Sequence, residues 1–284
     1  MFRKDQYQLL DFGNGRRLER FGQFVLNRPC PAGEGVALGD PAAWKKADAE
    51  YVRREPEGGN WRSKQQMPLS WSINYGKLQF ELKLTDFGHV GIFPEQAGNW
   101  DWIAKQVKSA GEPLKVLNLF AYTGGATMAA AAAGAEVVHV DAAQNTVLWA
   151  RRNTEASGLG DSSIRWITED AAKFVQRELK RKNTYHGVVL DPPTYGHGPK
   201  GEVWKIQEHL PPLLEMCAEL TKADRRFVLL SCHASRFVPA DLEKMLSDSL
   251  GETKRQRIEA GGLVLVSPDK RQLAGGIAAR WAAK

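Results

Sequence analysis

From residue 114 onward, short apolar stretches alternate with longer stretches of helical character. The expected strands are residues 115–120, 136–140, 163–167, 187–190, 226–230 and 262–267, and the expected helices are residues 125–133, 143–157, 171–182, 206–220 and 239–249. Strands that alternate with helices form crossover units, in which neighbouring strands are parallel and helices cover both faces of the sheet. We therefore predict an α/β fold with a doubly wound, mostly parallel sheet.

The first 90 residues have a different character. Asn14-Gly15 lies between two β-like stretches and predicts a tight hairpin turn. We also expect a strand at residues 21–27, a short helix at residues 44–54 and β-like stretches over residues 71–84. The sequence thus predicts a small β-rich module at residues 1–90 and a second domain at residues 91–284, which opens with a helix at residues 94–109.

A nucleotide-like cofactor is expected at the carboxyl end of this sheet. In doubly wound sheets, ligands bind beyond the carboxyl ends of the strands, where the strand order reverses. The first strand is followed by Gly124 and Gly125, which let the backbone turn sharply and approach a ligand closely. The second strand ends in Asp141, whose carboxylate can accept hydrogen bonds from both hydroxyls of a ribose. The third strand ends in the acidic pair Glu169-Asp170, where an adenine ring would lie.

The fourth strand ends in Asp191-Pro192-Pro193. The two prolines fix the backbone and remove two amide donors, so we expect a rigid edge with the Asp191 carboxylate and backbone carbonyls facing the cavity. A dinucleotide-dependent dehydrogenase would require a Gly-x-Gly-x-x-Gly loop, and the loop after the first strand lacks that spacing. These features together disfavour a dehydrogenase.

Residues 117–125 resemble the first motif of the class I methyltransferases, which use S-adenosylmethionine (SAM). Asp141 matches the acid that binds the ribose in that family, Asp170 the acid beside the adenine, and Asp191-Pro192-Pro193 the fourth motif. The resemblance implies a class I methyltransferase fold with SAM as its cofactor. The cofactor-binding residues that it implies are Phe120, Ala121, Tyr122, Thr123, Gly124, Gly125, Asp141, Asp170 and Asp191.

More narrowly, residues 118–125 together with Asp191-Pro192-Pro193 are similar to the bacterial large-subunit rRNA methyltransferases, a family of cytosine-C5 and guanine enzymes. The similarity covers about residues 76–270, and the first 75 residues do not match the RNA-binding module of that family. It implies methyl transfer to a base in rRNA, with the module at residues 1–90 as a candidate for substrate or RNA recognition. Two alternatives stay open: a methyltransferase that acts on a small molecule or a protein, and a non-catalytic RNA-binding protein with this fold.

Two chemistries are open for the acceptor atom. The fifth strand ends in Ser231-Cys232-His233, and we expect Cys232 to face the same crevice as Pro193 because the fourth and fifth strands are neighbours in this fold. A thiolate there can attack C6 of a pyrimidine and make C5 nucleophilic, which requires a lowered thiol pKa. The alternatives are that Cys232 is a small buried residue, or that Asp191 and the Pro192 carbonyl hold an exocyclic amine. The candidate catalytic residues are Asp191, Pro192, Pro193 and Cys232.

Charge and composition bear on partners and location. The formal net charge of +6 suits an RNA partner, because Lys and Arg near phosphates release counterions. Tyr195 and Trp204 would offer aromatic faces to a base extruded from its stack. No apolar run approaches the roughly 18 residues that span a bilayer, so we expect a cytoplasmic protein without a membrane segment. The cysteines form no Cys-x-x-Cys pair, so we expect no metal site; the oligomeric state stays open.

Overall fold

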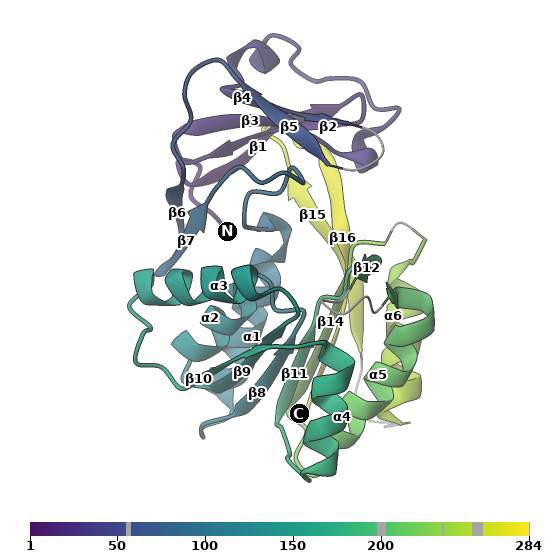
Figure 1. Ribbon diagram of the computed structural model, residues 1–284. Helices are drawn as coiled ribbons and strands as arrows, with labels where there is room; N and C mark the ends of the chain where they lie inside the picture. Colours follow the sequence, from purple (N-terminus) through teal and green to yellow (C-terminus); the bar gives the residue numbers. More distant parts are fainter. Residues whose placement is uncertain (55–57, 198–202, 235, 252–257, 284) are drawn as a thin grey trace. The chain divides into compact units, whose positions relative to one another are not determined.

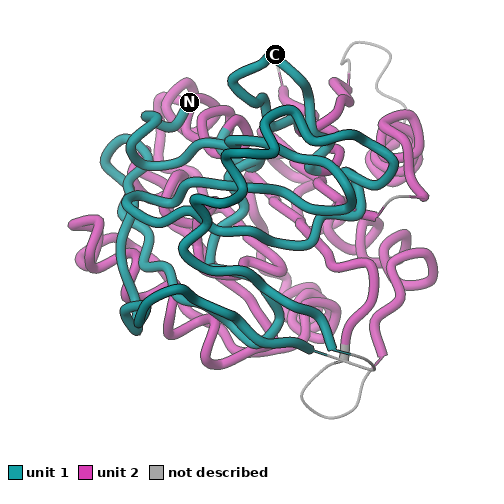
Figure 2. The backbone as a smooth tube through the Cα atoms, turned by 90° about the horizontal axis from the view of Figure 1, so that it is seen from above, with its two compact units in different colours: residues 1–97, 264–275 teal, residues 98–263, 276–284 magenta. Residues whose placement is uncertain are grey.

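The computed structural model describes residues 1–54, 58–197, 203–234, 236–251 and 258–283. The chain divides into two compact units, which Figure 2 shows in teal and magenta. Unit 1 comprises residues 1–97 and 264–275, and unit 2 comprises residues 98–263 and 276–284. The return of residues 264–275 to unit 1 differs from the expected two-domain division, whose boundary at residue 90 stays a prediction.

Unit 2 is built on a seven-stranded sheet with the order β10-β9-β8-β11-β14-β16-β15 (Figure 1). The strands are β8 (Lys115–Leu119), β9 (Glu136–Asp141), β10 (Ile164–Thr168), β11 (Gly187–Leu190), β14 (Phe227–Cys232), β15 (Glu259–Val266) and β16 (Gln272–Ala282). The β10–β9, β9–β8, β8–β11 and β11–β14 pairs are parallel, and β16 runs antiparallel to β14. The prediction of a doubly wound, mostly parallel sheet is therefore confirmed.

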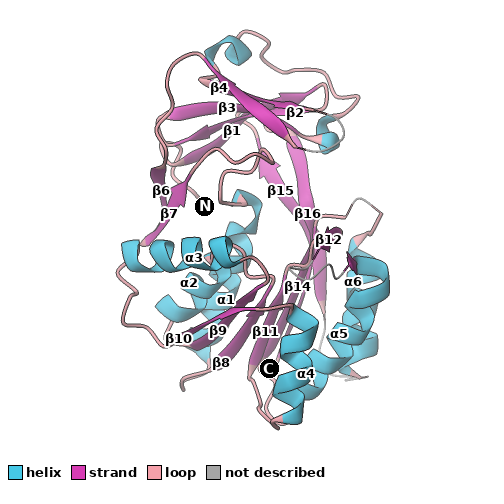
Figure 3. Cartoon of the chain, viewed as in Figure 1, coloured by secondary structure: helices cyan, strands magenta, loops and turns pink. Residues whose placement is uncertain are grey.

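Helices cover both faces of this sheet, with α1, α2 and α3 on one side and α4, α5 and α6 on the other (Figures 1 and 3). Their bounds are α1 (Ala97–Ser109), α2 (Gly125–Ala132), α3 (Gln144–Ala156), α4 (Ala171–Lys180), α5 (Ile206–Thr221) and α6 (Pro239–Leu250). Alternate strand residues supply the two cores. Val116 and Val189 pack with Ile103 of α1, whereas Leu117 and Leu190 belong to the cluster that contains α4, α5 and α6.

The strand β16 was missed by the sequence analysis. Its sequence begins Gln-Leu-Ala-Gly-Gly and continues with several alanines. Glycine and alanine are depleted in strands, and the stretch shows no clear alternation of apolar and polar residues. The strand exists because Ile277 to Ala282 pair with Cys232 to Phe227 of β14, a contact that local sequence does not reveal.

Unit 1 contains a five-stranded sheet with the order β1-β2-β3-β4-β5 and a separate hairpin of β6 and β7. The strands are β1 (Tyr7–Gly13), β2 (Arg16–Phe21), β3 (Phe24–Pro29), β4 (Ala49–Arg53), β5 (Gly59–Ser63), β6 (Trp71–Tyr75) and β7 (Leu78–Leu82). Asn14 and Gly15 form the predicted turn between β1 and β2, each with a positive φ. The strand expected at residues 21–27 lies later, at β3.

The expected helix at residues 44–54 is wrong. A short 3₁₀ helix covers Ala43–Lys46, and the rest of that segment forms β4. Ala49 and Tyr51 are buried and alternate with less buried neighbours, so one face of β4 packs inward while its edges pair with β3 and β5. This burial and pairing outweigh the charged character that favoured a helix.

Arg271 explains why the segment between β15 and β16 belongs to unit 1. Its guanidinium donates to the backbone carbonyls of Phe12 and Ala37, each at 3.0 Å, and pairs with the buried carboxylate of Asp11. The indole N–H of Trp44 donates to the same carboxylate at 2.7 Å. A guanidinium that donates to several acceptors, one of them a buried carboxylate, holds together chain segments that lie far apart in sequence.

Candidate active site

The strand order of unit 2 reverses beside β8. From β8 the chain continues to β9 and β10 on one side and then returns to β11 on the other. Ligands of doubly wound sheets bind beyond the carboxyl ends of the strands at such a point. The predicted residues after β8, β9, β10 and β11 all lie in unit 2 and at these carboxyl ends.

The loop after β8 has an unusual backbone. Phe120 and Tyr122 adopt positive φ angles of 53° and 48°, and Gly124 has a φ of 90° immediately before α2. Positive φ is costly for bulky residues and is found where the surrounding structure enforces it, often at functional sites. Here the side-chain amide of Asn153 donates to the Thr123 carbonyl at 2.9 Å and holds the loop from beneath.

Asp141 fastens the same loop to the end of β9. Its carboxylate accepts hydrogen bonds from the backbone amides of Tyr122 at 2.9 Å and Ala143 at 3.0 Å. Burial raises the pKa of Asp141, and these two hydrogen bonds act in the opposite direction. A carboxylate offers about four lone-pair sites, so two acceptor positions remain for ribose hydroxyls. The site therefore fits the nucleoside part of the predicted cofactor.

The two glycines of the loop have different structural reasons. Gly124 is required by its positive φ. Gly125 is required by packing, because a Cβ atom there would lie 2.7 Å from the indole of Trp100 in α1. The sequence pattern explains both glycines by the turn and by ligand approach, and it gives no indication of the contact with Trp100.

Substituting Gly125 with alanine should destabilise unit 2 by about 1–3 kcal/mol, because the added methyl overlaps the Trp100 ring. Urea unfolding followed by circular dichroism measures the change. Gly160 has open space around it and no positive φ, so Gly160→Ala is the matched control and should change stability by less than about 0.5 kcal/mol. Equal stability of the two variants would contradict the packing role of Gly125.

Asp170 lies at the end of β10 and caps α4. Its side chain accepts a hydrogen bond from the backbone amide of Lys173 at 2.9 Å. The neighbouring Glu169 pairs with Arg177 at 2.7 Å. Both acids thus have local structural partners, and the proposed contact of Asp170 with an adenine stays a prediction.

A buried network of polar side chains links α2 to the neighbouring strands β8 and β9. The amide of Asn118 in β8 donates to Thr127 Oγ1 at 2.9 Å, and Thr127 Oγ1 lies 2.9 Å from Nδ1 of His139 in β9. Burial lowers the pKa of His139 to about 3, so its imidazole is neutral at physiological pH. Polar residues inside apolar strands were the sequence signal for this network, which the sequence analysis did not use.

The segment Asp191-Pro192-Pro193, which follows β11, is held by a residue of β13 (Val203–Lys205). The strand β13 pairs with β12 (Tyr195–His197). The indole N–H of Trp204 donates to the Pro193 carbonyl at 2.7 Å, and its ring lies 4.8 Å from that of Phe120. Trp204 is only 9% exposed, so it is not an open stacking face for a base, contrary to expectation. Tyr195 is 55% exposed and remains such a face.

Asp191 receives two side chains from the end of β14. Ser231 Oγ donates to Asp191 Oδ1 at 2.7 Å, and His233 Nε2 lies 3.6 Å from the same oxygen. The side chain of Asp191 is 26% exposed, so it remains accessible from solvent. The sequence pointed to Ser231 and His233 only as neighbours of Cys232, and it predicted no contact of either residue with Asp191.

The environment of Cys232 is opposite to that of an activated thiol. Its side chain is 0% exposed and belongs to the apolar cluster that includes Leu190 and Ala234. Burial raises the pKa of Cys232, the negative charge of Asp191 raises it further, and a hydrogen bond from the Ala234 amide lowers it. A nucleophilic thiol requires a lowered pKa and access to its target. The geometry therefore favours the interpretation of Cys232 as a small buried residue.

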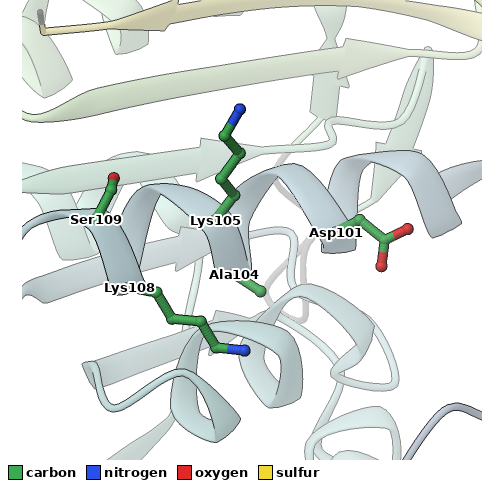
Figure 4. A pocket seen from close by; sticks show the side chains of 5 residues that line it. All are labelled: Asp101, Ala104, Lys105, Lys108 and Ser109. Atoms are coloured by element: carbon green, nitrogen blue, oxygen red, sulfur yellow. The ribbon is translucent and has the colours of Figure 1, made fainter.

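A surface depression elsewhere in unit 2 does not resemble a cofactor site. Figure 4 shows that its lining residues all project from α1: Asp101, Ala104, Lys105, Lys108 and Ser109. No strand end contributes to it. Across the described ranges, no three His, Cys, Asp or Glu side chains are grouped as a metal site would need. Within the same residues, no helix has the length and apolar character to cross a membrane.

Comparison with known proteins identifies the family of this chain. A family model described as S-adenosylmethionine-dependent methyltransferase matches residues 45–228, which is more than half of the chain. The chain is 34% identical over 122 residues to the ribosomal RNA large subunit methyltransferase K/L of Magnetococcus marinus, covering 42% of this chain and 16% of that protein. It is 36% identical over 110 residues to the ribosomal RNA large subunit methyltransferase I of Aeromonas hydrophila, covering 38% and 27%. The chain thus spans only about a sixth to a quarter of these curated relatives.

A solved structure resembles nearly the whole chain. The SAM-dependent methyltransferase from Agrobacterium tumefaciens matches with a TM-score of 0.92 and 36% identity, covering 98% of this chain and 91% of that one. This structural similarity agrees with the class I methyltransferase fold that the strand order of unit 2 indicates. The chain therefore belongs to the family of S-adenosylmethionine-dependent methyltransferases and is an enzyme that uses S-adenosylmethionine as its methyl donor.

Proposed function

We propose that the enzyme methylates a base in large-subunit ribosomal RNA. The observation that carries this proposal is the similarity to curated relatives named as ribosomal RNA large subunit methyltransferases, with 34% and 36% identity in the two cases above. The net charge of +6 is consistent with a polyanionic substrate. An rRNA substrate implies a location in the cytoplasm, and a role of unit 1 in RNA recognition forms part of the same proposal.

The residues after β8, β9 and β10 would bind the cofactor. The backbone from Phe120 to Gly125 would surround the methionine part, Asp141 would accept from the ribose hydroxyls, and Asp170 would lie beside the adenine. SAM supplies an electrophilic methyl group on its sulfonium. The described contacts hold this loop before the cofactor binds, which reduces the conformational entropy that binding must overcome.

The edge after β11 would bind the acceptor. The Asp191 carboxylate, together with the backbone carbonyl of Pro192, would accept hydrogen bonds from the polar edge of the target base and orient it. The hydrogen bond from Trp204 to Pro193 keeps this edge rigid. Because a base inside a helix is out of reach, it must leave its stack, and the exposed ring of Tyr195 offers it a stacking partner.

Mass spectrometry of rRNA nucleosides tests the proposal. A strain without the enzyme should lack one methylated nucleoside of its large-subunit rRNA, and the purified enzyme with SAM should restore it in vitro. The identity of that nucleoside also gives the methylated atom. An unchanged nucleoside profile would contradict the proposal and favour a small-molecule or protein substrate instead.

Replacing Cys232 with alanine separates the two acceptor chemistries. Because the thiol is enclosed and its pKa is raised, we expect Cys232→Ala to retain methyl transfer within about tenfold of the wild type. Initial rates with tritiated SAM and RNA from the deletion strain provide the measurement. Complete loss of transfer with unchanged SAM affinity would instead support attack by Cys232 on a cytosine.

A further inference from the structure

Side chains from two neighbouring strands meet at one carboxylate oxygen. Asp191 directly follows β11, Ser231 is the penultimate residue of β14, and these strands pair in parallel register with Leu190 opposite Leu230. Ser231 Oγ donates to Asp191 Oδ1 at 2.7 Å, and His233 Nε2 lies 3.6 Å from the same atom. The intervening Cys232 is buried in the apolar cluster, because successive residues of a strand point to opposite faces.

We propose that Ser231 is a positioning residue, which fixes the rotamer of Asp191 so that the carboxylate meets the acceptor base in one orientation. The inference rests on the proposed role of Asp191. A hydroxyl that donates to an ionised carboxylate forms a charge-assisted hydrogen bond, about twice as strong as a neutral one. Such a bond restrains a side chain that stands just beyond the end of its strand and is partly exposed.

Ser231 is itself held rigidly. It is buried, its strand is paired with β11 on one side and β16 on the other, and its backbone lies opposite Ala278. Its hydroxyl also lies 3.4 Å from the Leu190 carbonyl, which is the residue before Asp191. Because Ser231 is fixed in an inner strand of the sheet, its hydroxyl can hold the Asp191 carboxylate in one position. Functional sites need this kind of support from rigid elements.

The neighbouring His233 occupies space that β16 leaves open. Gly276 has a φ of 146°, and a Cβ atom there would lie 3.1 Å from His233 Nδ1 and 2.9 Å from the Cys232 carbonyl oxygen. At 3.6 Å from the carboxylate oxygen, His233 Nε2 lies beyond the range of a direct hydrogen bond. We therefore assign the orientation of Asp191 to Ser231 and test that residue.

A double-mutant cycle on methyl transfer provides the first test. Ser231→Ala should lower kcat about ten- to a hundredfold while the Kd for SAM stays within about twofold, because only the acceptor is misplaced. Ser231→Thr retains the hydroxyl and should recover most of the rate. In an Asp191→Ala background, Ser231→Ala should have little further effect. The matched control is Ser249→Ala, which removes a partly buried hydroxyl bonded at 2.8 Å to the Met245 carbonyl in α6 and should leave kcat unchanged.

A second cycle does not depend on the substrate. Urea unfolding is measured for the wild type, Ser231→Ala, Asp191→Ala and the double variant. We expect the two substitutions to be coupled by about three- to tenfold in the unfolding equilibrium constant. This range is modest because Asp191 is partly exposed, and solvent weakens the interaction. Absence of coupling overturns the inference, whatever the RNA assay shows. Absence of methyl transfer to RNA by the wild type contradicts the proposed function and leaves this unfolding test unaffected. Full kcat in Ser231→Ala, or an equal loss in the Asp191→Ala background, also overturns it.

Discussion

Asp191→Ala is expected to lower methyl transfer at least about a hundredfold while leaving SAM affinity nearly unchanged. The carboxylate lies at the carboxyl end of β11, beside the point where the strand order reverses, and is oriented by the hydroxyl of Ser231. Without it, the acceptor loses the group that would hold it in line with the methyl. Single-turnover rates with saturating SAM, together with calorimetry for SAM, measure the two effects separately.

Two variants complete this experiment. Asp191→Asn keeps the shape of the side chain but removes its charge and one acceptor oxygen, so its rate should fall between the wild type and Asp191→Ala. Asp161 is an exposed aspartate in the loop before β10, and Asp161→Ala should behave as the wild type. Full activity of Asp191→Ala would remove this carboxylate from the mechanism.

Asp141→Ala should weaken SAM binding about ten- to a hundredfold or more, which is the largest expected effect on the cofactor. The substitution removes the acceptors for the ribose hydroxyls and also frees the amides of Tyr122 and Ala143. The loop after β8 then loses one of the contacts that hold its strained residues. Calorimetry with SAM and with S-adenosylhomocysteine measures the affinity, and an unchanged Kd for both ligands would contradict the assignment.

The affinity for SAM should also depend on pH through Asp141. Burial raises its pKa above the ordinary value of 3.8, so the carboxylate is protonated at a higher pH than a free aspartate. As the pH falls through this raised pKa, the ionised acceptor is lost and the affinity declines. Asp141→Asn should abolish this decline in affinity at low pH.

The raised pKa also means that the folded chain binds the proton more readily than the unfolded chain, so the stability from this group decreases as pH rises between the two pKa values.

Much of the fold follows from local sequence patterns. The five parallel strands and their helices were predicted because apolar runs alternate with helical periodicity, and the signal is contained within each segment. The order of Gly124, Asp141, Asp170 and Asp191 along the chain places all four at strand ends, because consecutive strands of such a sheet share their direction. A nucleotide-like cofactor was therefore predictable from the pattern, and SAM was predicted from the resemblance of these motifs to the class I methyltransferases.

The missed features depend on contacts between distant segments. The Gly- and Ala-rich strand β16 exists through its pairing with β14, and Gly125 is required by the ring of Trp100, which precedes it by 25 residues. Trp204 reads as an exposed aromatic in the sequence, but its indole donates to Pro193 and its ring packs on Phe120. None of these pairings leaves a periodic signal in its own segment.

The sequence by itself determined the parallel sheet and, through the resemblance of its motifs, the methyltransferase family, since both depend on short-range patterns of residue type. Only the tertiary structure decided which member of Ser231-Cys232-His233 forms a hydrogen bond with Asp191. A strand alternates its side chains, and a shift of one residue exchanges the two faces. The pairing of β14 with β11 and β16 fixes that register, so it is the hydroxyl of Ser231 that contacts Asp191, while the thiol of Cys232 lies in the core.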